Sequence, residues 1–111
     1  MVGAQVFEVG SRRVDGHTVV AMAGELDVTT LPALADCVGE VMTEPSTDIV
    51  FDLSRLTFID SSGVNFLVRT DQTARARGAG VVVRSPARHV HKVLDICGVT
   101  RVLRVEAPQG A

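Results

Sequence analysis

The sequence predicts one α/β domain: a mixed sheet of about five strands, with about three helices packed mainly on one face. A chain of 111 residues is the size of one ordinary domain. Its composition, 46% hydrophobic and 22% charged, is that of a soluble globular protein, so intrinsic disorder is not expected. Short apolar runs alternate with segments of helical periodicity, and this alternation is typical of an α/β layer fold.

The strands are predicted from short runs of apolar side chains. Residues 5–9 alternate in polarity and indicate a short edge strand, with a polar turn following at 12–16. Residues 17–26 contain an unbroken apolar run, which is typical of a strand buried on both faces, and Gly24 is expected to end it. Later strands are expected at residues 48–54, 79–84 and 102–105, with a loop at 57–60.

Apolar side chains that recur three and four residues apart predict the helices. Thr29 and Thr30 are good N-caps for the first one, because a threonine hydroxyl accepts a hydrogen bond from a free backbone N–H. Glycine supplies the left-handed residue that commonly follows a helix. The three helices are expected from Thr30 to Pro45, from Ser61 or Ser62 to Arg77 before Gly78, and from Pro86 to Gly98.

The two cysteines are too few for a disulfide framework and do not form a metal motif. Free thiols in a reducing cytoplasm are the simplest interpretation. Cys97 lies on the apolar face of the last predicted helix and is expected to be buried, whereas Cys37 is expected to be at least partly accessible. No apolar run approaches the length needed to span a bilayer, and the first ten residues lack a signal-peptide pattern, so we expect a cytoplasmic protein without membrane insertion.

Charge and aromatic content argue against a nucleic-acid partner. The net charge is −2, and the chain has no Trp or Tyr on which bases could stack. The charges are nevertheless uneven, because residues 1–56 carry 9 acidic and 3 basic side chains, and residues 57–111 carry 4 and 8. A fold that keeps the two halves apart would have an acidic and a basic side, and the sequence alone leaves this open.

No catalytic residue, cofactor or metal is predicted. The sequence contains neither the Gly-x-Ser-x-Gly of a nucleophile elbow nor a phosphate-binding glycine loop. His89 and His91 are two apart on a predicted helix, about 200° around its axis, so they cannot share a metal ion or a substrate. The protein is therefore predicted not to be an enzyme.

The most informative segment is Asp60-Ser61-Ser62-Gly63, where a predicted strand leads into a helix. Free backbone N–H groups and the helix dipole favour negative charge at this position. A serine there either caps the helix or accepts a phosphate, and the local chemistry alone favours capping.

The helix that follows is expected to expose a stripe beside this serine. Helical periodicity groups Gly63, Phe66, Leu67, Thr70 and Ala74 on the core side. Ser61, Val64, Asn65 and Val68 fall on the opposite side, so two valines are expected to face outward in line with the serine. Such a stripe is a candidate partner surface.

Three motifs together resemble the anti-sigma factor antagonist family, whose fold is called the STAS domain. Asp60-Ser61-Ser62-Gly63 resembles the family's turn, and Gly24-Glu25-Leu26-Asp27 resembles its Gly-Glu-Leu-Asp strand end. The segment from Ser85-Pro86 to Gly98 is similar to its last helix. The resemblance covers nearly the whole chain, so residues 1–111 are expected to form a single STAS domain.

The resemblance implies a switch in protein binding. The unphosphorylated antagonist captures an anti-sigma factor that is also a serine kinase, with ATP bound by that partner, and so releases a sigma factor. Phosphorylation of the serine inactivates the antagonist, and a metal-dependent phosphatase restores it. Carried over to this chain, the phosphoacceptor is Ser61 and the partner surface comprises Asp27, Asp60, Ser62, Gly63, Val64, Asn65 and Val68.

Two points stay open in the resemblance. The family commonly has Gly-Leu-Gly where this chain has Gly63-Val64-Asn65, and the asparagine would lie beside Ser61 and change partner preference. Similar STAS domains also serve as scaffolds in stress-sensing assemblies or as accessory subunits of transporters, without a serine switch. This is the alternative function.

Overall fold

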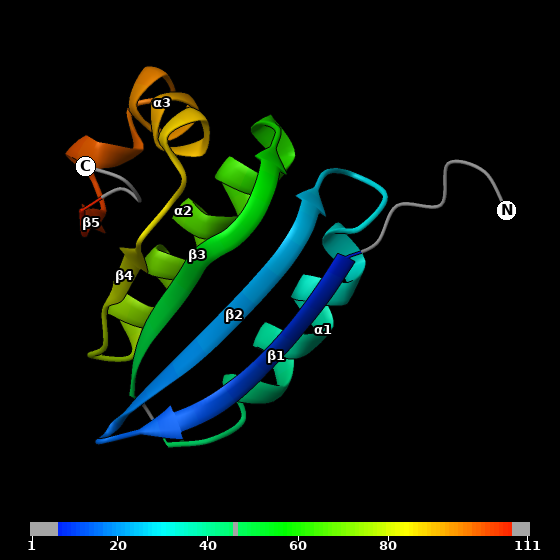
Figure 1. Cartoon of the computed structure of the whole chain (residues 1–111). Coiled ribbons are helices and arrows are strands. Elements are labelled where there is room, and N and C mark those ends of the chain that lie inside the picture. Colours follow the sequence, from blue (N-terminus) through cyan, green and yellow to red (C-terminus); the bar gives the residue numbers. More distant parts are fainter. Residues whose placement is uncertain (1–6, 46, 108–111) are drawn as a thin grey trace, which may run out of the picture.

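The computed structural model describes residues 7–45 and 47–107 as a five-stranded sheet with three α-helices (Figure 1). The strands follow their order in the chain, β1-β2-β3-β4-β5. β1 and β2 form an antiparallel hairpin, and the other neighbouring strands are parallel. The elements are β1 Phe7–Val14, β2 His17–Leu26, α1 Leu31–Val41, β3 Asp48–Ile59, α2 Ser61–Ala76, β4 Val81–Arg84, α3 Arg88–Ile96, the short 3₁₀ helix η1 Val99–Arg101 and β5 Arg104–Val105.

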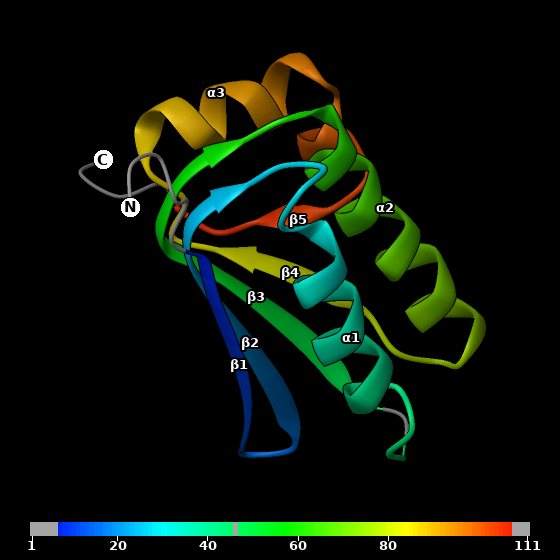
Figure 2. The same ribbon diagram turned by 90° about the vertical axis from the view of Figure 1, so that its right-hand side faces the viewer.

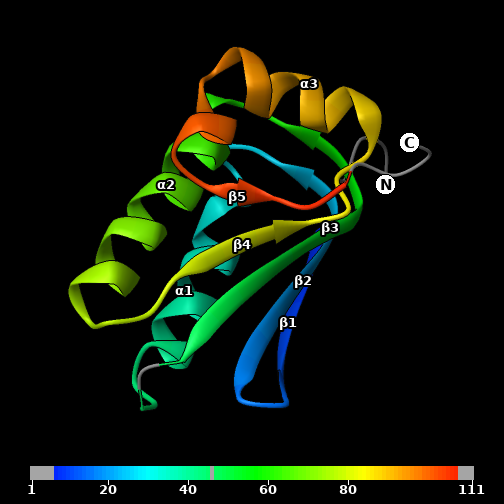
Figure 3. The same ribbon diagram turned by 90° about the vertical axis from the view of Figure 1, so that its left-hand side faces the viewer.

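The helices cover the sheet mainly on one face, as the sequence predicts. α1 and α2 lie side by side on that face, and α3 lies across the end at which β3 finishes (Figures 2 and 3). The core is the layer between them, and its fully buried members include Val20, Phe51 and Leu53 from the strands and Leu34 and Leu67 from the helices. No helix in the described part of the chain is long and apolar enough to cross a membrane.

The first strand is longer than the sequence predicts. It runs to Val14, and the turn shrinks to Asp15 and Gly16, which both have positive φ. The predicted polar turn is therefore confirmed at residues 15 and 16 and wrong at 12–14, because an edge strand leaves alternate side chains in solvent and so accommodates polar residues. Residues 5 and 6 of the predicted strand lie outside the described residues.

The second strand has the predicted bounds, but only part of it is buried on both faces. Val19 and Val20 are both buried, whereas the next residue, Ala21, is exposed because no helix covers that face of the sheet over β1 and β2 (Figure 2). Gly24 does not end the strand. It has a φ of 100° and lies where the register with β3 shifts.

The third strand is also longer than predicted, and this places the candidate site. Pairing with β2 continues to Leu26↔Ile59, so the loop expected at 57–60 is strand up to its last residue. The polar residues that suggested a loop are tolerated because the chain stays paired. Asp60 therefore follows directly after a strand end.

The helix ends differ from the sequence predictions by a few residues. α1 ends at Val41, before Pro45, and α3 begins at Arg88, after Pro86. α2 runs from Ser61 to Ala76, and Gly78 adopts the predicted left-handed conformation. β4 and β5 occupy only the last residues of their predicted ranges.

The exposure of the two thiols reverses one expectation. Both cysteines are free, as predicted, but Cys97 is exposed and Cys37 is half-buried against the core. Cys97 is the C-cap of α3 and lies just beyond the part of the helix whose side chains are buried. Burial also raises the pKa of the Cys37 thiol.

We therefore expect Cys97 to react with a thiol reagent before Cys37. Exposure favours Cys97, and the raised pKa of Cys37 leaves it less of the reactive thiolate at any pH below that pKa. Reaction kinetics of the Cys37→Ser and Cys97→Ser variants between pH 7 and 9 measure the two thiols separately. Equal rates for the two variants would contradict the exposures seen here.

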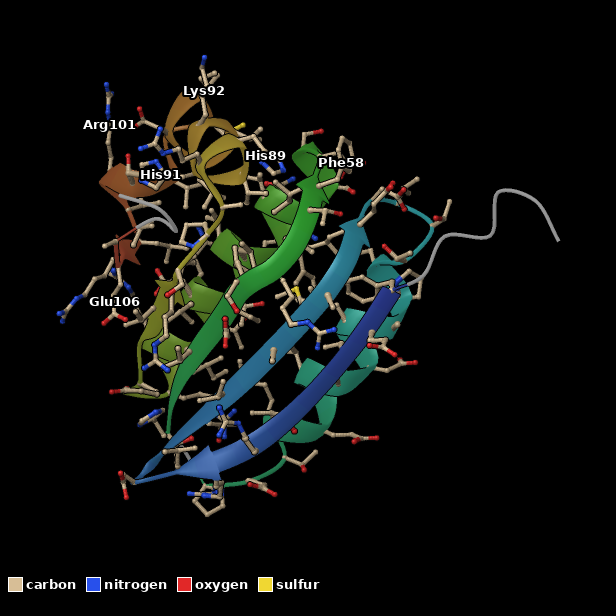
Figure 4. The ribbon with its side chains drawn as sticks, viewed as in Figure 1. Phe58, His89, His91, Lys92, Arg101 and Glu106 are labelled. Carbon is tan, nitrogen blue, oxygen red and sulfur yellow. The ribbon has the colours of Figure 1, made fainter. Side chains whose placement is uncertain are left out.

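The charged halves of the chain are only partly separate in space. Because the strand order follows the chain order, α1 and the turn after it lie at one side of the sheet, with Asp36, Glu40 and Glu44 exposed. Lys92 and Arg101, from α3 and η1, lie at the other side (Figure 4). The two sets of charges also meet, because Arg77 from the second half donates to the Glu44 carbonyl and Arg13 pairs with the Glu44 carboxylate. The structure therefore does not divide cleanly into an acidic and a basic side.

Candidate functional site

The candidate site lies where β2 and β3 end together. Leu26 pairs with Ile59 as the last pair of these parallel strands, and the Asp60 N–H donates a hydrogen bond to the Leu26 carbonyl at 3.2 Å. Asp27 and Asp60 are the next residues of the two strands, so both acidic residues lie at the same edge of the sheet.

Asp60, and not a serine, caps α2. Its Oδ1 accepts hydrogen bonds from the backbone N–H of Ser62 at 3.0 Å and of Gly63 at 3.1 Å. The Ser62 hydroxyl donates to the same oxygen at 2.6 Å. The expectation that a serine caps this helix is therefore wrong: a carboxylate satisfies the free N–H groups and complements the helix dipole.

The two serines of the turn consequently differ. The Ser62 side chain is half-buried and hydrogen-bonded to Asp60. Ser61 is exposed, and its hydroxyl makes no hydrogen bond to any residue that the structure describes. Of the two serines, Ser61 is thus the one whose hydroxyl is accessible and is not hydrogen-bonded to a described residue.

Asp27 orders the loop between β2 and α1. Its Oδ1 accepts hydrogen bonds from the backbone N–H of Thr29 at 2.9 Å and of Thr30 at 3.2 Å, and from the Thr29 hydroxyl at 2.6 Å. The Thr30 hydroxyl donates to the Glu25 carbonyl at 2.7 Å and does not cap α1, although Thr30 is the N-cap residue. Asp27 therefore orders the loop that follows β2, at the same edge of the sheet as Asp60.

Gly63 lets α2 approach the ends of the two strands. A Cβ at this position would lie 2.9 Å from side-chain atoms of both Leu26 and Ile59, which is closer than carbon atoms pack. Its buried position agrees with the core side that periodicity predicts. The absence of a side chain at Gly63 thus sets how closely the first turn of α2 approaches the strand ends, and with it the position of Ser61.

The outward stripe predicted for α2 is partly wrong. Ser61 and Asn65 are exposed as expected, but Val64 is only 6% exposed, and Val68 is half-buried against the core. The buried arc is wider than one face because Val64 belongs to the core cluster and Val68 packs against it. At the other end of α2, Arg75, paired with the buried Asp71, donates to the Val102 carbonyl at 3.2 Å. The exposed row is Ser61, Asn65, Arg69 and Gln72.

Sequence reasoning missed two exposed apolar residues beside the site. Val28 is 69% exposed and directly follows Asp27, and Phe58 is 45% exposed and lies two residues before Asp60. Phe58 lies next to His89 of α3 (Figure 4), whose ring nitrogen Nε2 is within hydrogen-bonding distance of the Thr57 carbonyl. A large apolar residue beside each acidic turn is a signal that the sequence does contain.

The histidine and acidic side chains are spread over the described part of the molecule. His89 and His91 point to different sides of α3 (Figure 4). Among the residues with described positions, no three His, Cys, Asp or Glu side chains are arranged to hold a metal ion.

Comparison with known proteins finds a matching family model and similar curated proteins. The family model described as "Mlab, STAS domain" matches residues 9–105. The chain is 29% identical over 92 residues to the anti-sigma-F factor antagonist RsfB of Mycobacterium tuberculosis, a match that covers 82% of this chain and 74% of that protein.

Solved structures agree with these matches. The crystal structure of an anti-sigma factor antagonist from Mycobacterium paratuberculosis superposes with a TM-score of 0.78 at 29% identity, covering 94% of this chain and 88% of that one. The structure of the anti-sigma factor antagonist SpoIIAA in its unphosphorylated form has a TM-score of 0.76 at 23% identity, covering 92% and 90%, which bears on the fold alone.

Proposed function

The chain belongs to the STAS-domain family, and we propose that it is an anti-sigma factor antagonist inactivated by phosphorylation of Ser61. Its partner is an anti-sigma factor with serine kinase activity, which binds the ATP, and a metal-dependent phosphatase removes the phosphate. The unphosphorylated protein captures the anti-sigma factor in the cytoplasm and thereby releases a sigma factor.

The observation that supports the switch is the difference between the two serine hydroxyls. A kinase needs a hydroxyl that it can reach and that is free to attack a phosphoryl group. The Ser61 hydroxyl is exposed, whereas the Ser62 hydroxyl is bound to the carboxylate that caps α2. Ser61 is therefore the proposed phosphoacceptor.

Phosphate on Ser61 is expected to disrupt binding and leave the fold intact. It adds a charge of roughly −1.5 to −2 close to Asp60. The N-terminus of α2 offsets this repulsion within the protein by about 0.3–1 kcal/mol. A phosphate enclosed in an interface without a partner has no such compensation, so the change appears in affinity for the anti-sigma factor.

The proposed partner surface follows from exposure. Ser61 and Asn65 contact the partner from α2, and the exposed Val28 and Phe58 extend the surface over the ends of β2 and β3. Asp27, Asp60, Ser62 and Gly63 hold these residues in position. Val64 and Val68 contribute by packing the helix, and Asn65 in place of the family's glycine adjusts partner preference.

The decisive experiment compares binding by Ser61 and Ser62 variants. Each purified anti-sigma factor of the source organism is titrated with the wild type, Ser61→Ala and Ser61→Asp. In a separate reaction, each of these proteins is incubated with the anti-sigma factor and ATP, and the phosphorylated residue is mapped. We expect Ser61→Ala to bind like the wild type, Ser61→Asp several-fold more weakly, and the phosphorylated form on the order of 100-fold more weakly or beyond.

Ser62→Ala is the matched control. It should still accept one phosphate on Ser61, and Ser61→Ala should accept none. Because Asp60 caps the helix, Ser61→Ala should change the free energy of unfolding by less than about 0.5 kcal/mol. Phosphate found mainly on Ser62 would refute Ser61 as the phosphoacceptor. No phosphate on either serine, together with equal affinities for the Ala and Asp variants, would refute the switch and favour a scaffold or transporter-subunit role.

A further inference from the structure

One long strand edge of the sheet pairs with no further strand among the described residues. β1 is the terminal strand, and within residues 7–45 and 47–107 its eight residues pair with β2 alone (Figure 1). The strand at the other end, β5, has only two residues. An edge strand carries a row of backbone N–H and C=O groups that a further strand can pair with.

The side chains of β1 divide between the two faces of the sheet. Phe7 and Val9 pack against the core on the side of α1, and Arg13 forms an ion pair with Glu44 at 2.8 Å. By strand alternation, Glu8, Gly10 and Arg12 lie on the opposite face, which no helix covers at this edge (Figure 2). Both charged residues are exposed, and neither forms an ion pair within the described residues.

These features lead us to propose that β1 is a homodimer interface, in which a second copy of this chain pairs antiparallel with β1 about a two-fold axis at Gly10. In this register each Gly10 faces its counterpart, and each Glu8 faces an Arg12 on the same face. The symmetry gives two reciprocal ion pairs. Oppositely charged side chains directly across an antiparallel pair stabilise it.

No other symmetric register pairs these charges. If Glu8 or Arg12 lay on the two-fold axis, it would face its own copy and bring like charges together. If Val9 or Ser11 lay on the axis, a charged residue of one copy would lie opposite Gly10 of the other and would have no partner. A pairing shifted by one residue would set side chains of one face opposite side chains of the other face. Charged residues on an edge strand usually prevent association. Here Glu8 and Arg12 lie at equal distances on either side of Gly10, so two antiparallel copies bring opposite charges together and favour one defined dimer.

The geometry of the rest of the molecule is compatible with this pairing. A Cβ placed on Gly10 meets no atom within 4 Å, so the axis position is open. Ser61 follows β3, two strands away from this edge, and the two-fold axis places the two Ser61 sites at opposite ends of the dimer. Dimerisation therefore leaves both candidate sites accessible, and it does not depend on the proposed function.

Cysteine cross-linking tests the register directly. In a Cys37→Ser/Cys97→Ser background, Gly10→Cys should form a covalent dimer under mild oxidation, because facing Cα atoms about 4.5–5.5 Å apart fall in the range of disulfides. Glu8→Cys alone and Arg12→Cys alone should stay monomeric, whereas a mixture of the two should cross-link. Ala21→Cys, exposed on the neighbouring strand and paired with Gly10, is the control and should not cross-link.

Charge reversal provides a second, independent measurement. Sedimentation equilibrium of the unmodified protein should show a dimer, and Glu8→Arg should weaken it at least tenfold by replacing two attractions with two repulsions. The double variant Glu8→Arg/Arg12→Glu should restore the wild-type dimerisation constant. A monomer at all concentrations up to several hundred micromolar, or equal cross-linking at all four positions, would overturn the proposal.

Discussion

Val64→Asp is expected to abolish cooperative unfolding or to lower the free energy of unfolding by about 4 kcal/mol or more. The valine is 6% exposed and belongs to the core cluster, so the substitution removes its apolar burial and puts an unpaired carboxylate in its place. Small domains are stable by only about 5–15 kcal/mol, so this one change removes a large part of the total. Chemical denaturation monitored by circular dichroism measures the effect.

Two neighbours on α2 provide the comparison. Val68→Asp should cost less, because Val68 is half-buried, and Asn65→Asp should change stability by less than about 0.5 kcal/mol, because Asn65 is exposed. A graded order of Val64, Val68 and Asn65 supports the orientation of the helix described above. If Val64→Asp unfolded like the wild type, the helix would instead be rotated as the sequence periodicity predicts.

Gly63→Ala is expected to destabilise the protein by about 1–3 kcal/mol, although alanine is normally the better helix residue. The added Cβ would lie 2.9 Å from Leu26 and Ile59 side-chain atoms, so α2 or the strand ends must shift. The shift also moves Ser61, because it lies two residues before Gly63. We therefore expect slower phosphorylation together with lower stability.

Gly39→Ala is the matched control for this prediction. Gly39 lies inside α1, and a Cβ there would meet no atom within 4 Å. The same substitution should stabilise the protein by roughly 0.5–1 kcal/mol, because alanine has the higher helix propensity. If Gly63→Ala lowers the free energy of unfolding and Gly39→Ala raises it, the effect of close packing is separated from that of helix propensity. If both substitutions raise the free energy of unfolding, the close contact at Gly63 is contradicted.

The fold class could be predicted from the sequence because its signals are local. Apolar runs indicate strands, three- and four-residue spacings indicate helices, and β2 was bounded correctly by its long apolar run. Strand ends were less predictable: β1 and β3 carry polar residues that resemble a turn or a loop, and only pairing with β2 keeps them extended. Strand pairing depends on residues far apart in the chain, so no local pattern shows it.

The candidate site was predicted in part for the same reason. Asp60-Ser61-Ser62-Gly63 was located correctly as a strand-to-helix junction. Local chemistry favours a serine cap over a phosphoacceptor, but the preceding aspartate competes for the same N–H groups and forms the stronger, charge-assisted hydrogen bonds. The burial of Val64 differs from the prediction because periodicity gives one direction to the core, whereas the buried arc of α2 extends beyond that direction.

The sequential order of the strands has a consequence for how the protein is made. Each strand after the first pairs with the one synthesised just before it, so the sheet can grow at a single edge as the chain emerges from the ribosome. The β1–β2 hairpin needs no later part of the chain, and each following strand adds with its connecting helix. No strand must wait for a distant partner, and this limits the time for which unpaired strands are exposed to aggregation during synthesis.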